Sequence, residues 1–332
     1  MPLDPARTVA ELRELRELTG DDSGAQRVAW TDTWERARDW LREKVAGTGA
    51  DEEVDAAGNQ WFTLRGASDR ALLLGGHIDS VPNGGWLDGC LNVMAGVEVL
   101  RRIAEEGEPP LTVRLVNWAD EEGARFGRSL FGSSAAAGSM ADQDELRAKV
   151  DAAGIALPDA LSAHGVDLDR ALDARTQLEN AAAYLELHIE QGPVLESMDL
   201  PLGVVLGTFG VERHLVTFRG QAAHAGSTPM DKRRDALAGA ARLELEIREI
   251  AKRTGEGAVC TMGGVVTRPG IVTSVVETAE CLLDQRHLDA SKLAAMLEDA
   301  KSASQRFAQE EDIEVEWERI WNIEPILFDE AL

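Results

Sequence analysis

The stretch from Ala71 to Gly89 reads ALLLGGHIDSVPNGGWLDG. Its first residues form a short apolar run that predicts a buried strand, and the glycines that follow allow the backbone to fold tightly. The run delivers His77, and then Asp79 and Asp88, into this glycine-rich loop. An imidazole nitrogen and carboxylates brought together in this way are typical ligands of a divalent metal. The alternative is a structural loop, in which an aspartate caps the backbone and the histidine is hydrogen-bonded.

A second apolar run, LTVRLVNW over residues 111–118, leads into three consecutive carboxylates, Asp120, Glu121 and Glu122. The run predicts another buried strand. Carboxylates this close together repel one another and raise one another's pKa unless a positive charge lies among them. A metal ion would supply that charge, and one glutamate could bind it while its neighbour stays free as a base. The alternative is a solvated acidic turn, which is common in an acidic chain.

A third run, AYLELHI over residues 183–189, predicts a strand that delivers His188, with Gln191 shortly after it. A lone histidine at such a position is more often structural than a ligand. In open α/β sheets, however, the binding site lies beyond the carboxyl ends of the strands. Three apolar strands that each end in potential ligands therefore predict a shared metal site.

Composition limits the class of protein. The chain has 332 residues, enough for two domains, and its hydrophobic content of 44% is ordinary for a soluble globular protein. The net charge of −25 disfavours binding to nucleic acid and to anionic membranes. No apolar run approaches the roughly 18 residues that span a bilayer, and the N-terminus lacks the pattern of a signal peptide. The 3 cysteines form no CxxC pair, so we expect reduced thiols and a cytoplasmic location.

The order of predicted elements divides the chain. Helical periodicity covers residues 9–18 and 25–45, and a predicted helix at 92–105 separates the strands at 71–74 and 111–118. This order predicts an α/β fold with a mostly parallel, mixed sheet. From residue 207 to 322 the pattern changes to that of an α+β domain. Its predicted strands cover 212–219, 258–266, 274–284 and 313–321, and its predicted long helices cover 235–253 and 291–310.

The second domain contains its own loop of interest, GQAAHAGSTPM over residues 220–230. Small residues flank His224, so its imidazole should be accessible and could donate a hydrogen bond to an oxyanion. The alternative is a polar turn at the entry to a helix. His214 alternates with apolar residues on a predicted strand, which favours a structural role.

Five motifs together carry a resemblance to a known family. HIDSVPNGGWLDG, DEEGARFG, LELHIEQGPVLE, GQAAHAGSTPM and LDQR occur in the order and approximate spacing of the amidase/hydantoinase/carbamoylase family of dinuclear metallohydrolases. This family includes N-carbamoyl-L-amino acid hydrolase, β-ureidopropionase and allantoate amidohydrolase. The resemblance implies a metallopeptidase-like catalytic domain over residues 1–206 and an inserted α+β lid and dimerisation domain over 207–322. Residues 323–332 would begin the returning catalytic segment, with the remainder absent.

The resemblance also implies two divalent metal ions, which could be zinc, manganese or cobalt. His77 and His188 resemble the ligands of one metal, Asp88 the carboxylate that bridges both, and Glu122 a ligand of the second. Asp79 would lie behind His77, accept its other N–H and fix the orientation of the ring. The family's last histidine ligand of the second metal belongs to the C-terminal segment, so we expect this chain to lack it.

The remaining family positions concern catalysis and substrate. Glu121 resembles the general base, and Gln191 resembles a substrate-binding side chain. His224 resembles the lid histidine that polarises the substrate carbonyl, often across a dimer. Arg286 matches the arginine that binds the substrate carboxylate, a task suited to a guanidinium. Thr273 stands where the family usually has an asparagine. A hydroxyl can donate one hydrogen bond but cannot reproduce an amide, so the resemblance leaves the substrate preference open.

The implied activity is metal-dependent hydrolysis of a linear amide or ureido C–N bond in a small molecule, most simply an N-carbamoyl-L-amino acid. The implied assembly is a homodimer through the lid domain. Two alternatives remain open from the sequence. One is an aminoacylase or dipeptidase on the same fold, and the other is a shortened, inactive chain that only binds metal.

Overall fold

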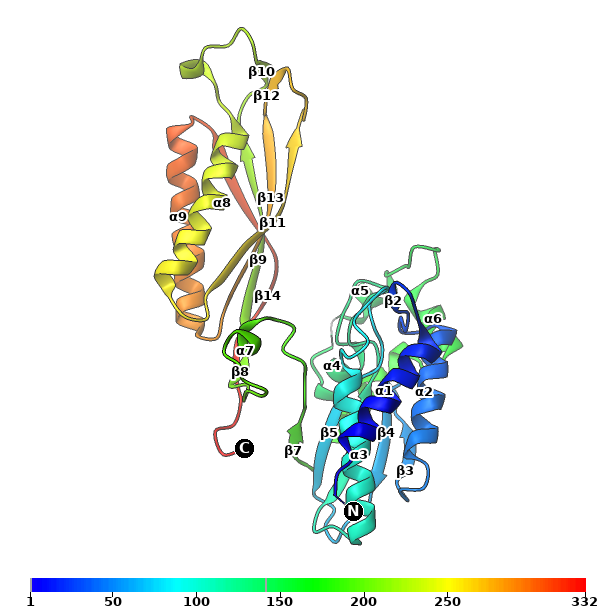
Figure 1. Ribbon diagram of the computed structural model, residues 1–332. Coiled ribbons are helices and arrows are strands. Elements are labelled where there is room, and N and C mark those ends of the chain that lie inside the picture. The colour runs from blue at the N-terminus through cyan, green and yellow to red at the C-terminus, as the bar shows by residue number, and fades with distance from the viewer. Residues whose placement is uncertain (1, 141) are drawn as a thin grey trace. The chain divides into compact units, whose positions relative to one another are not determined.

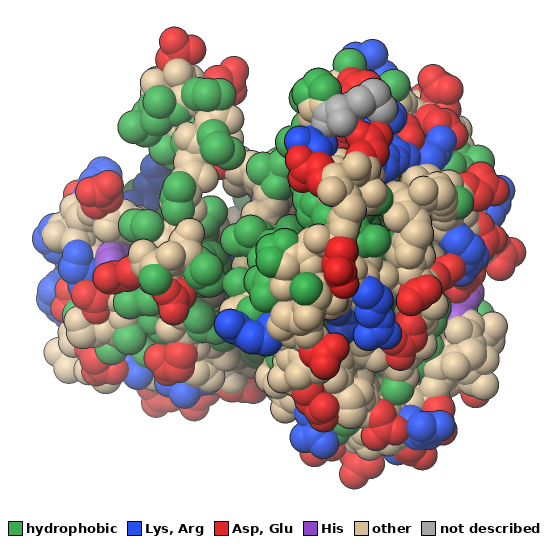
Figure 2. All heavy atoms as spheres, turned by 90° about the horizontal axis from the view of Figure 1, so that it is seen from below, with side chains coloured by type: hydrophobic (Ala, Val, Ile, Leu, Met, Phe, Trp, Pro, Cys, Tyr) green, Lys and Arg blue, Asp and Glu red, His purple; other side chains and the backbone are tan. Residues whose placement is uncertain are grey.

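The computed structural model describes residues 2–140 and 142–332, which fold into two compact units (Figure 1). Unit 1 is Met1–Ser197 and unit 2 is Met198–Leu332. Within the described residues, no helix is both long enough and apolar enough to cross a membrane. On the face that Figure 2 shows, acidic side chains are scattered among basic and apolar ones, so the negative charge is spread over the surface there.

Unit 1 is built on a mixed sheet with the strand order β3-β4-β6-β5-β7. Strand β5 runs parallel to both of its neighbours, whereas β4 runs antiparallel to β3 and β6. The prediction of a mixed α/β fold is confirmed. The strands are β3 (Asp51–Val54), β4 (Gln60–Leu64), β5 (Ala71–His77), β6 (Thr112–Trp118) and β7 (Ala181–Leu185).

Helices cover both faces of this sheet. Phe62, Val113 and Leu115 pack against the first three helices, α1 (Pro5–Thr19), α2 (Asp32–Val45) and α3 (Cys90–Glu106). Trp61 and Leu73 pack on the opposite face, where Leu178 covers them. The remaining elements of unit 1 are β1 (Gly20–Asp21), β2 (Gly24–Ala25), α4 (Phe131–Ala137), α5 (Gln143–Arg147), α6 (Leu157–Ala163), the 3-10 helix η1 (Leu168–Leu178) and α7 (Val194–Ser197).

The predicted helix over residues 25–45 is wrong in its first turns. Helix α2 begins at Asp32, where the Thr31 hydroxyl accepts a hydrogen bond from Trp34 N at 3.4 Å and so caps the helix. Trp30 has a left-handed φ of 61°, which a helix does not tolerate. The backbone groups of Ala25 instead bond to Gly84 in the glycine-rich loop. Tertiary hydrogen bonds therefore override the helical periodicity of this segment.

The predicted strand over residues 183–189 is shorter than expected. Strand β7 ends at Leu185, and residues 186–190 pair with no strand within the described part of the chain. His188 thus lies on an irregular segment beyond the strand, three residues past its end. The ring is placed locally, because its Nδ1 lies 2.6 Å from the carbonyl oxygen of Ile189.

Unit 2 consists of an antiparallel sheet, β11-β13-β9-β14, with two long helices on one face (Figure 1). Its core lies between sheet and helices, with Val216 and Phe218 facing Leu243, Ile247 and Met296. Short ribbons pair at the ends of the unit. The elements are β8 (Gly207–Thr208), β9 (Gly210–Arg219), β10 (Ala223–His224), the 3-10 helix η2 (Met230–Lys232), α8 (Ala236–Thr254), β11 (Val259–Arg268), β12 (Ser274–Val275), β13 (Thr278–His287), α9 (Ala290–Glu310), β14 (Glu314–Ile323) and β15 (Ile326–Leu327).

Candidate metal centre

The centre begins where β5 ends and α3 begins. His77 is the last residue of β5, and α3 starts at Cys90 directly after Asp88 and Gly89. Gly89 has φ 65°, and a Cβ at this position would lie 2.5 Å from Nε2 of His77. Only glycine therefore lets the chain turn against the imidazole and bring Asp88 beside it.

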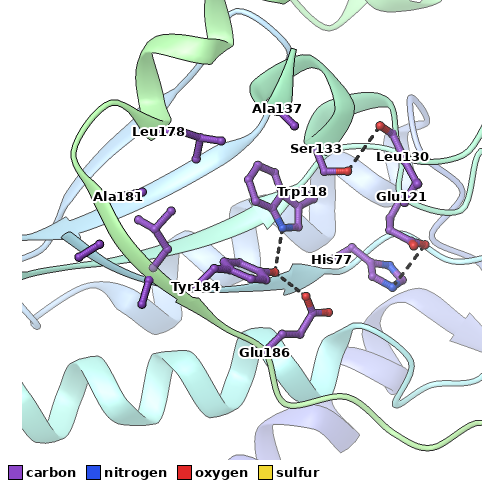
Figure 3. Close-up of a pocket in the computed structure, with 13 residues that line it drawn as sticks. His77, Trp118, Glu121, Leu130, Ser133, Ala137, Leu178, Ala181, Tyr184 and Glu186 are labelled. Atoms are coloured by element: carbon purple, nitrogen blue, oxygen red, sulfur yellow. Dashed lines mark hydrogen bonds and ion pairs between the residues drawn. The ribbon is translucent and has the colours of Figure 1, made fainter. Parts of the chain in front are cut away.

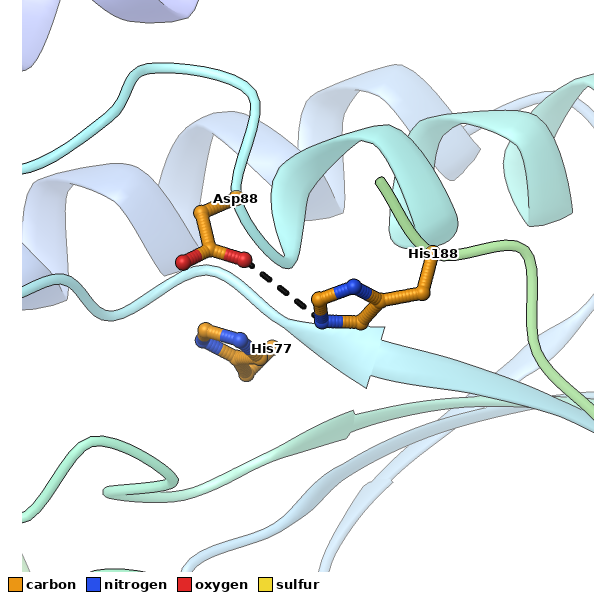
Figure 4. A group of neighbouring side chains, drawn as sticks. All are labelled: His77, Asp88 and His188. Carbon is orange, nitrogen blue, oxygen red and sulfur yellow. Dashed lines mark ion pairs between the residues drawn. The ribbon is translucent and has the colours of Figure 1, made fainter. Parts of the chain in front are cut away.

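His77, Asp88 and His188 converge on one point (Figure 4). Each offers one ligand atom, and these atoms all lie within 4.8 Å of one another. His188 Nε2 is 3.5 Å from Asp88 Oδ1. That carboxylate oxygen is buried and has no hydrogen-bond partner among the described residues. A buried, unpartnered carboxylate oxygen between two imidazoles fits the donor set that a divalent metal prefers.

Asp79 orients His77 and also connects the two loops. Nδ1 of His77 is 3.1 Å from the backbone oxygen of Asp79 and 3.5 Å from its carboxylate. The same carboxylate accepts hydrogen bonds from the backbone N–H groups of Glu121 and Glu122, at 3.3 and 3.1 Å. With Nδ1 engaged in this way, Nε2 of His77 is directed toward the centre.

The charges around His77 are strongly unbalanced. Burial by itself lowers the pKa of His77, but Asp79, Glu121 and Asp88 outweigh it and raise the pKa to about 9. Glu121 Oε2 lies 3.7 Å from His77 Nε2. Burial, reinforced by the neighbouring carboxylates, raises the pKa of both Glu121 and Glu122. The centre thus has an excess of negative charge that a bound cation would neutralise.

Asp120 lies deeper than the two glutamates. It is buried, its φ is 54°, and its carboxylate accepts a hydrogen bond from Trp30 Nε1 at 2.8 Å. Burial, with the charges of Asp79 and Glu121, raises the pKa of Asp120 to about 7. Asp120 therefore anchors the acidic turn, whereas Glu121 faces His77.

A cavity of about 450 Å³ opens beside the centre (Figure 3). Apolar residues of β5, β6, β7, η1 and α4 form most of its wall, and His77 and Glu121 also line it. Tyr184 donates a hydrogen bond to Glu186 and accepts one from Trp118 Nε1 at 3.0 Å. Sequence reasoning missed Tyr184 and Glu186. Their i, i+2 spacing at the end of an apolar strand was the available signal, because it places both side chains on one face.

Gln191, the residue predicted to bind substrate, also reaches the centre. Gln191 Nε2 donates a hydrogen bond to Asp88 Oδ2 at 2.6 Å. Asp88 therefore uses one oxygen for Gln191 and leaves the other directed toward the two histidines. This arrangement places the Gln191 amide beside the candidate metal position.

In unit 2, His224 and Thr273 are neighbours. His224 pairs with Ser274 between β10 and β12, and Ala225 N donates to the Thr273 carbonyl at 2.9 Å. Gly226 N donates to His224 Nδ1 at 3.1 Å. Nδ1 must then be the acceptor nitrogen, so the proton of a neutral ring resides on Nε2 and is available to donate.

Arg286 lies elsewhere in unit 2. It is on β13, and its guanidinium forms an ion pair with Asp284 at 2.7 Å. Asp284 also accepts from Arg213 Nε at 2.8 Å. Arg286 lies about eight residues along β13 from Thr278, which at about 3.3 Å per residue is roughly 26 Å. Thr278 marks the end of the sheet nearest to His224 and Thr273, so unit 2 does not bring Arg286 together with them.

Comparison with known proteins identifies the class. Residues 73–332 match the model of peptidase family M20/M25/M40. The chain is 38% identical over 327 residues to an N-carbamoyl-L-amino acid amidohydrolase of Geobacillus stearothermophilus, covering 97% of this chain and 79% of that protein. It is 34% identical over 312 residues to the allantoate amidohydrolase of Escherichia coli K12, covering 93% of this chain and 75% of that protein.

Solved structures agree. A hydantoinase/carbamoylase family amidase from Burkholderia ambifaria superimposes with a TM-score of 0.88 at 31% identity, covering 99% of this chain and 80% of that one. A second such amidase, from Burkholderia multivorans, has a TM-score of 0.89 at 30% identity, with the same coverage of both chains. The chain belongs to peptidase family M20/M25/M40. Within it, the chain is an amidohydrolase related to the carbamoylases and allantoate amidohydrolases.

Proposed function

We propose that this chain hydrolyses a linear ureido or amide C–N bond, with an N-carbamoyl-L-amino acid or a related ureido acid as substrate. The observation that carries the proposal is the convergence of His77, Asp88 and His188, with Glu121 directly beside them. The relatives support the same chemistry, because those named above are a carbamoyl-amino-acid amidohydrolase and an allantoate amidohydrolase.

The residues of unit 1 fit a divalent metal. We propose that His77 and His188 hold one ion, that Asp88 is shared with a second ion, and that Glu122 belongs to the second. Zinc, manganese and cobalt all suit this mixture of imidazole and carboxylate ligands. A bound ion of this kind supplies Lewis acidity and lowers the pKa of water. The unpartnered Oδ1 of Asp88 is the feature of the chain that such an ion would complete.

Glu121 is the proposed general base. Its carboxylate is about one third exposed, and it faces His77 Nε2 at 3.7 Å. Burial raises its pKa, which makes this carboxylate a stronger base than an exposed glutamate. In this role Glu121 accepts the proton of the attacking water and then delivers it to the leaving nitrogen. Asp79 fixes its backbone by accepting its N–H, so the carboxylate stays beside the reacting atoms.

The substrate contacts are proposed for Gln191, His224, Thr273 and Arg286. His224 would donate from Nε2 to the carbonyl oxygen as negative charge develops there, and Arg286 would bind the carboxylate. The separation of roughly 26 Å along β13 is much longer than a carbamoyl amino acid. A single copy of unit 2 therefore cannot present His224 and Arg286 to one substrate. This supports a homodimer in which the two residues come from different copies.

The test is ammonia release by purified chain that has been stripped of metal and reloaded with zinc, manganese or cobalt. N-carbamoyl-L-amino acids, allantoate, N-acyl amino acids and dipeptides form the substrate panel. We expect turnover of a ureido substrate, and Glu121→Gln should reduce it by about 10² to 10⁴-fold, the usual contribution of a general base. The control is Glu43→Gln on the exposed surface of α2, which should leave turnover unchanged.

The substrate panel and the Glu121→Gln variant test the proposed substrate and the proposed base separately. Cleavage of acyl amino acids or dipeptides in place of ureido acids would replace the proposed substrate. Full activity in Glu121→Gln would remove that residue from the mechanism. A metal-loaded chain that releases no ammonia from any ureido substrate would overturn the proposal.

A further inference from the structure

The segment from Ala25 to Arg27 runs alongside the loop that carries the candidate metal ligands. Gly84 N donates to the Ala25 carbonyl at 3.2 Å, and Ala25 N donates to the Gly84 carbonyl at 2.9 Å. Ser80 N donates to the Arg27 carbonyl at 3.0 Å, and the Ser80 hydroxyl accepts from Arg27 N at 3.0 Å. The glycine-rich loop is therefore held in place from one side by an extended segment distant in sequence.

The side chain of Arg27 enters the protein at this point and is completely buried. Its Nε donates to the Ile78 carbonyl at 2.7 Å, and its Nη2 lies 3.1 Å from the Cys90 sulfur. Its Nη1 donates to the Thr19 hydroxyl at 3.3 Å. Ile78 directly follows His77, and Cys90 comes two residues after Asp88. One guanidinium thus contacts both segments that present these ligands. It bonds to the backbone directly after His77 and to the Cys90 side chain at the start of α3.

The burial of Arg27 is costly. A buried guanidinium loses its hydration, which is unfavourable even in relaxed protein interiors. Among the described residues, no carboxylate forms an ion pair with Arg27, so no direct partner offsets that cost. Its hydrogen bonds go to a carbonyl, a hydroxyl and a thiol instead. An apolar side chain would fill the space at lower cost, so packing alone does not account for an arginine here.

We propose that Arg27 is a positioning residue, which holds His77 and Asp88 at the separation that binds a metal ion without touching the ion itself. This rests on the proposed metal site. Its planar fork is rigid, so it fixes the Ile78 carbonyl relative to the start of α3. Without it, the loop from Ile78 to Gly89 would sample other conformations, and binding would have to order the ligands first. The consequence is weaker metal binding, not a different metal.

The chain offers a matched control in Arg38. This arginine is also buried in unit 1, donates to a backbone carbonyl, that of Gly58, at 3.0 Å, and stacks on Trp34. Among the described residues, its side chain forms no hydrogen bond or ion pair with the glycine-rich loop or with the start of α3. Arg27→Met and Arg38→Met therefore remove the same kind of group from the same unit, and only the first touches the ligand-bearing segments.

The experiment measures metal affinity by calorimetry and by competition with a chromophoric chelator, using zinc and manganese, alongside the thermal midpoint of the metal-free chain. Both variants should lower that midpoint. Arg27→Met should weaken metal binding about 10 to 100-fold, the range for groups that support a ligand from behind, whereas Arg38→Met should change it less than about 3-fold. Arg27→Lys should recover part of the loss, because an ammonium can satisfy only some of the three acceptors.

Unchanged metal affinity in Arg27→Met, or an equal loss in Arg38→Met, would overturn the proposal. If Arg27→Met does not fold, Cys90→Ala decides, because it removes one acceptor and keeps the guanidinium. It should weaken metal binding about 2 to 10-fold, the equivalent of one hydrogen bond, and an unchanged affinity would count against the role. Metal binding by a chain that cleaves no substrate would refute the proposed function and leave the role of Arg27 standing.

Discussion

His77 in unit 1 and His214 in unit 2 are both buried on strands, but the charges around the two rings differ. His77 is 3% exposed and His214 is 4% exposed. The carboxylates around His77 raise its pKa to about 9. At His214, burial comes first and the charges of Arg319 and Lys301 add to it, so its pKa falls to about 4. Glu212 lies 3.7 Å from His214, but burial raises the pKa of that carboxyl as well.

The difference shows what distinguishes a site from a core. His214 is in mid-strand, where its ring packs edge-on against Trp317, and Leu215 and Val216 follow it along β9. His77 is at the strand end, where the backbone leaves the sheet and three segments meet. Burial of a histidine is therefore no evidence for a metal site. The negative charge of the groups around a histidine, and its position where strand ends meet, do indicate such a site.

The largest expected contrast concerns metal binding. His77→Asn should weaken zinc or manganese affinity by more than about 100-fold, because it removes a ligand and not merely a supporting group. His214→Asn should leave the affinity within about 3-fold of the original. Calorimetric titration of metal-free protein measures both. Equal losses of affinity in the two variants would contradict the assignment of His77, and not His214, as a metal ligand.

A second contrast uses two glycines. In Gly89→Ala the new Cβ would lie 2.3 Å from the His77 carbonyl oxygen at a positive φ, so we expect a loss of about 2–4 kcal/mol in the free energy of unfolding, together with weaker metal binding. Gly263 on β11 has open space where a Cβ would be built. Gly263→Ala should change stability by less than about 0.5 kcal/mol. Denaturant unfolding tests both, and a tolerated Gly89→Ala would show that the turn at Asp88 is not rigid.

The smallest contrast is in pH dependence. Because the pKa of His214 is about 4 in the folded protein and about 6.5 when unfolded, the unfolded state binds a proton first as pH falls. The stabilisation from a neutral His214 is thus complete above pH 6.5 and is lost between pH 6.5 and 4, by up to about 3 kcal/mol. Thermal midpoints of the metal-free chain from pH 7.5 to 4.5 should fall less steeply in His214→Gln.

The exposed His224 provides the control for this measurement. His224→Asn should keep the original dependence of the midpoint on pH. If His214→Gln also keeps the original pH dependence of the midpoint, His214 is not the group responsible. The contrast between the pKa values of His77 and His214 would then be wrong.

Much of the architecture was predictable because strands and helices leave periodic apolar patterns. The runs that became β5 and β6, and the long helices α8 and α9, were identified with small shifts at their ends. The conformation of residues 25–31 was not, because Ala25 and Arg27 form hydrogen bonds with Gly84 and Ser80, more than fifty residues away. The helical periodicity of residues 25–45 reflects local spacing only, and the long-range hydrogen bonds override it in the first turns.

The candidate centre shows the same division. The residue types at the strand ends indicated metal ligands, and the structure brings His77, Asp88 and His188 within 4.8 Å. Whether these residues bind metal stays a prediction, as do the roles of Glu121, His224 and Arg286. Arg27 was not found from the sequence, because nothing in its local pattern shows that its side chain reaches the ligand-bearing segments.

The sequence by itself determined the order of strands and helices, the family, and which chemical groups stand at the strand ends. These follow from residue type and local spacing. Only the tertiary structure decided which of two buried histidines lies among carboxylates and which lies among cations, and that a buried arginine joins the segments of two ligands. The physical reason is that charge interactions and hydrogen bonds depend on separation in space over a few ångströms, which local sequence spacing does not specify.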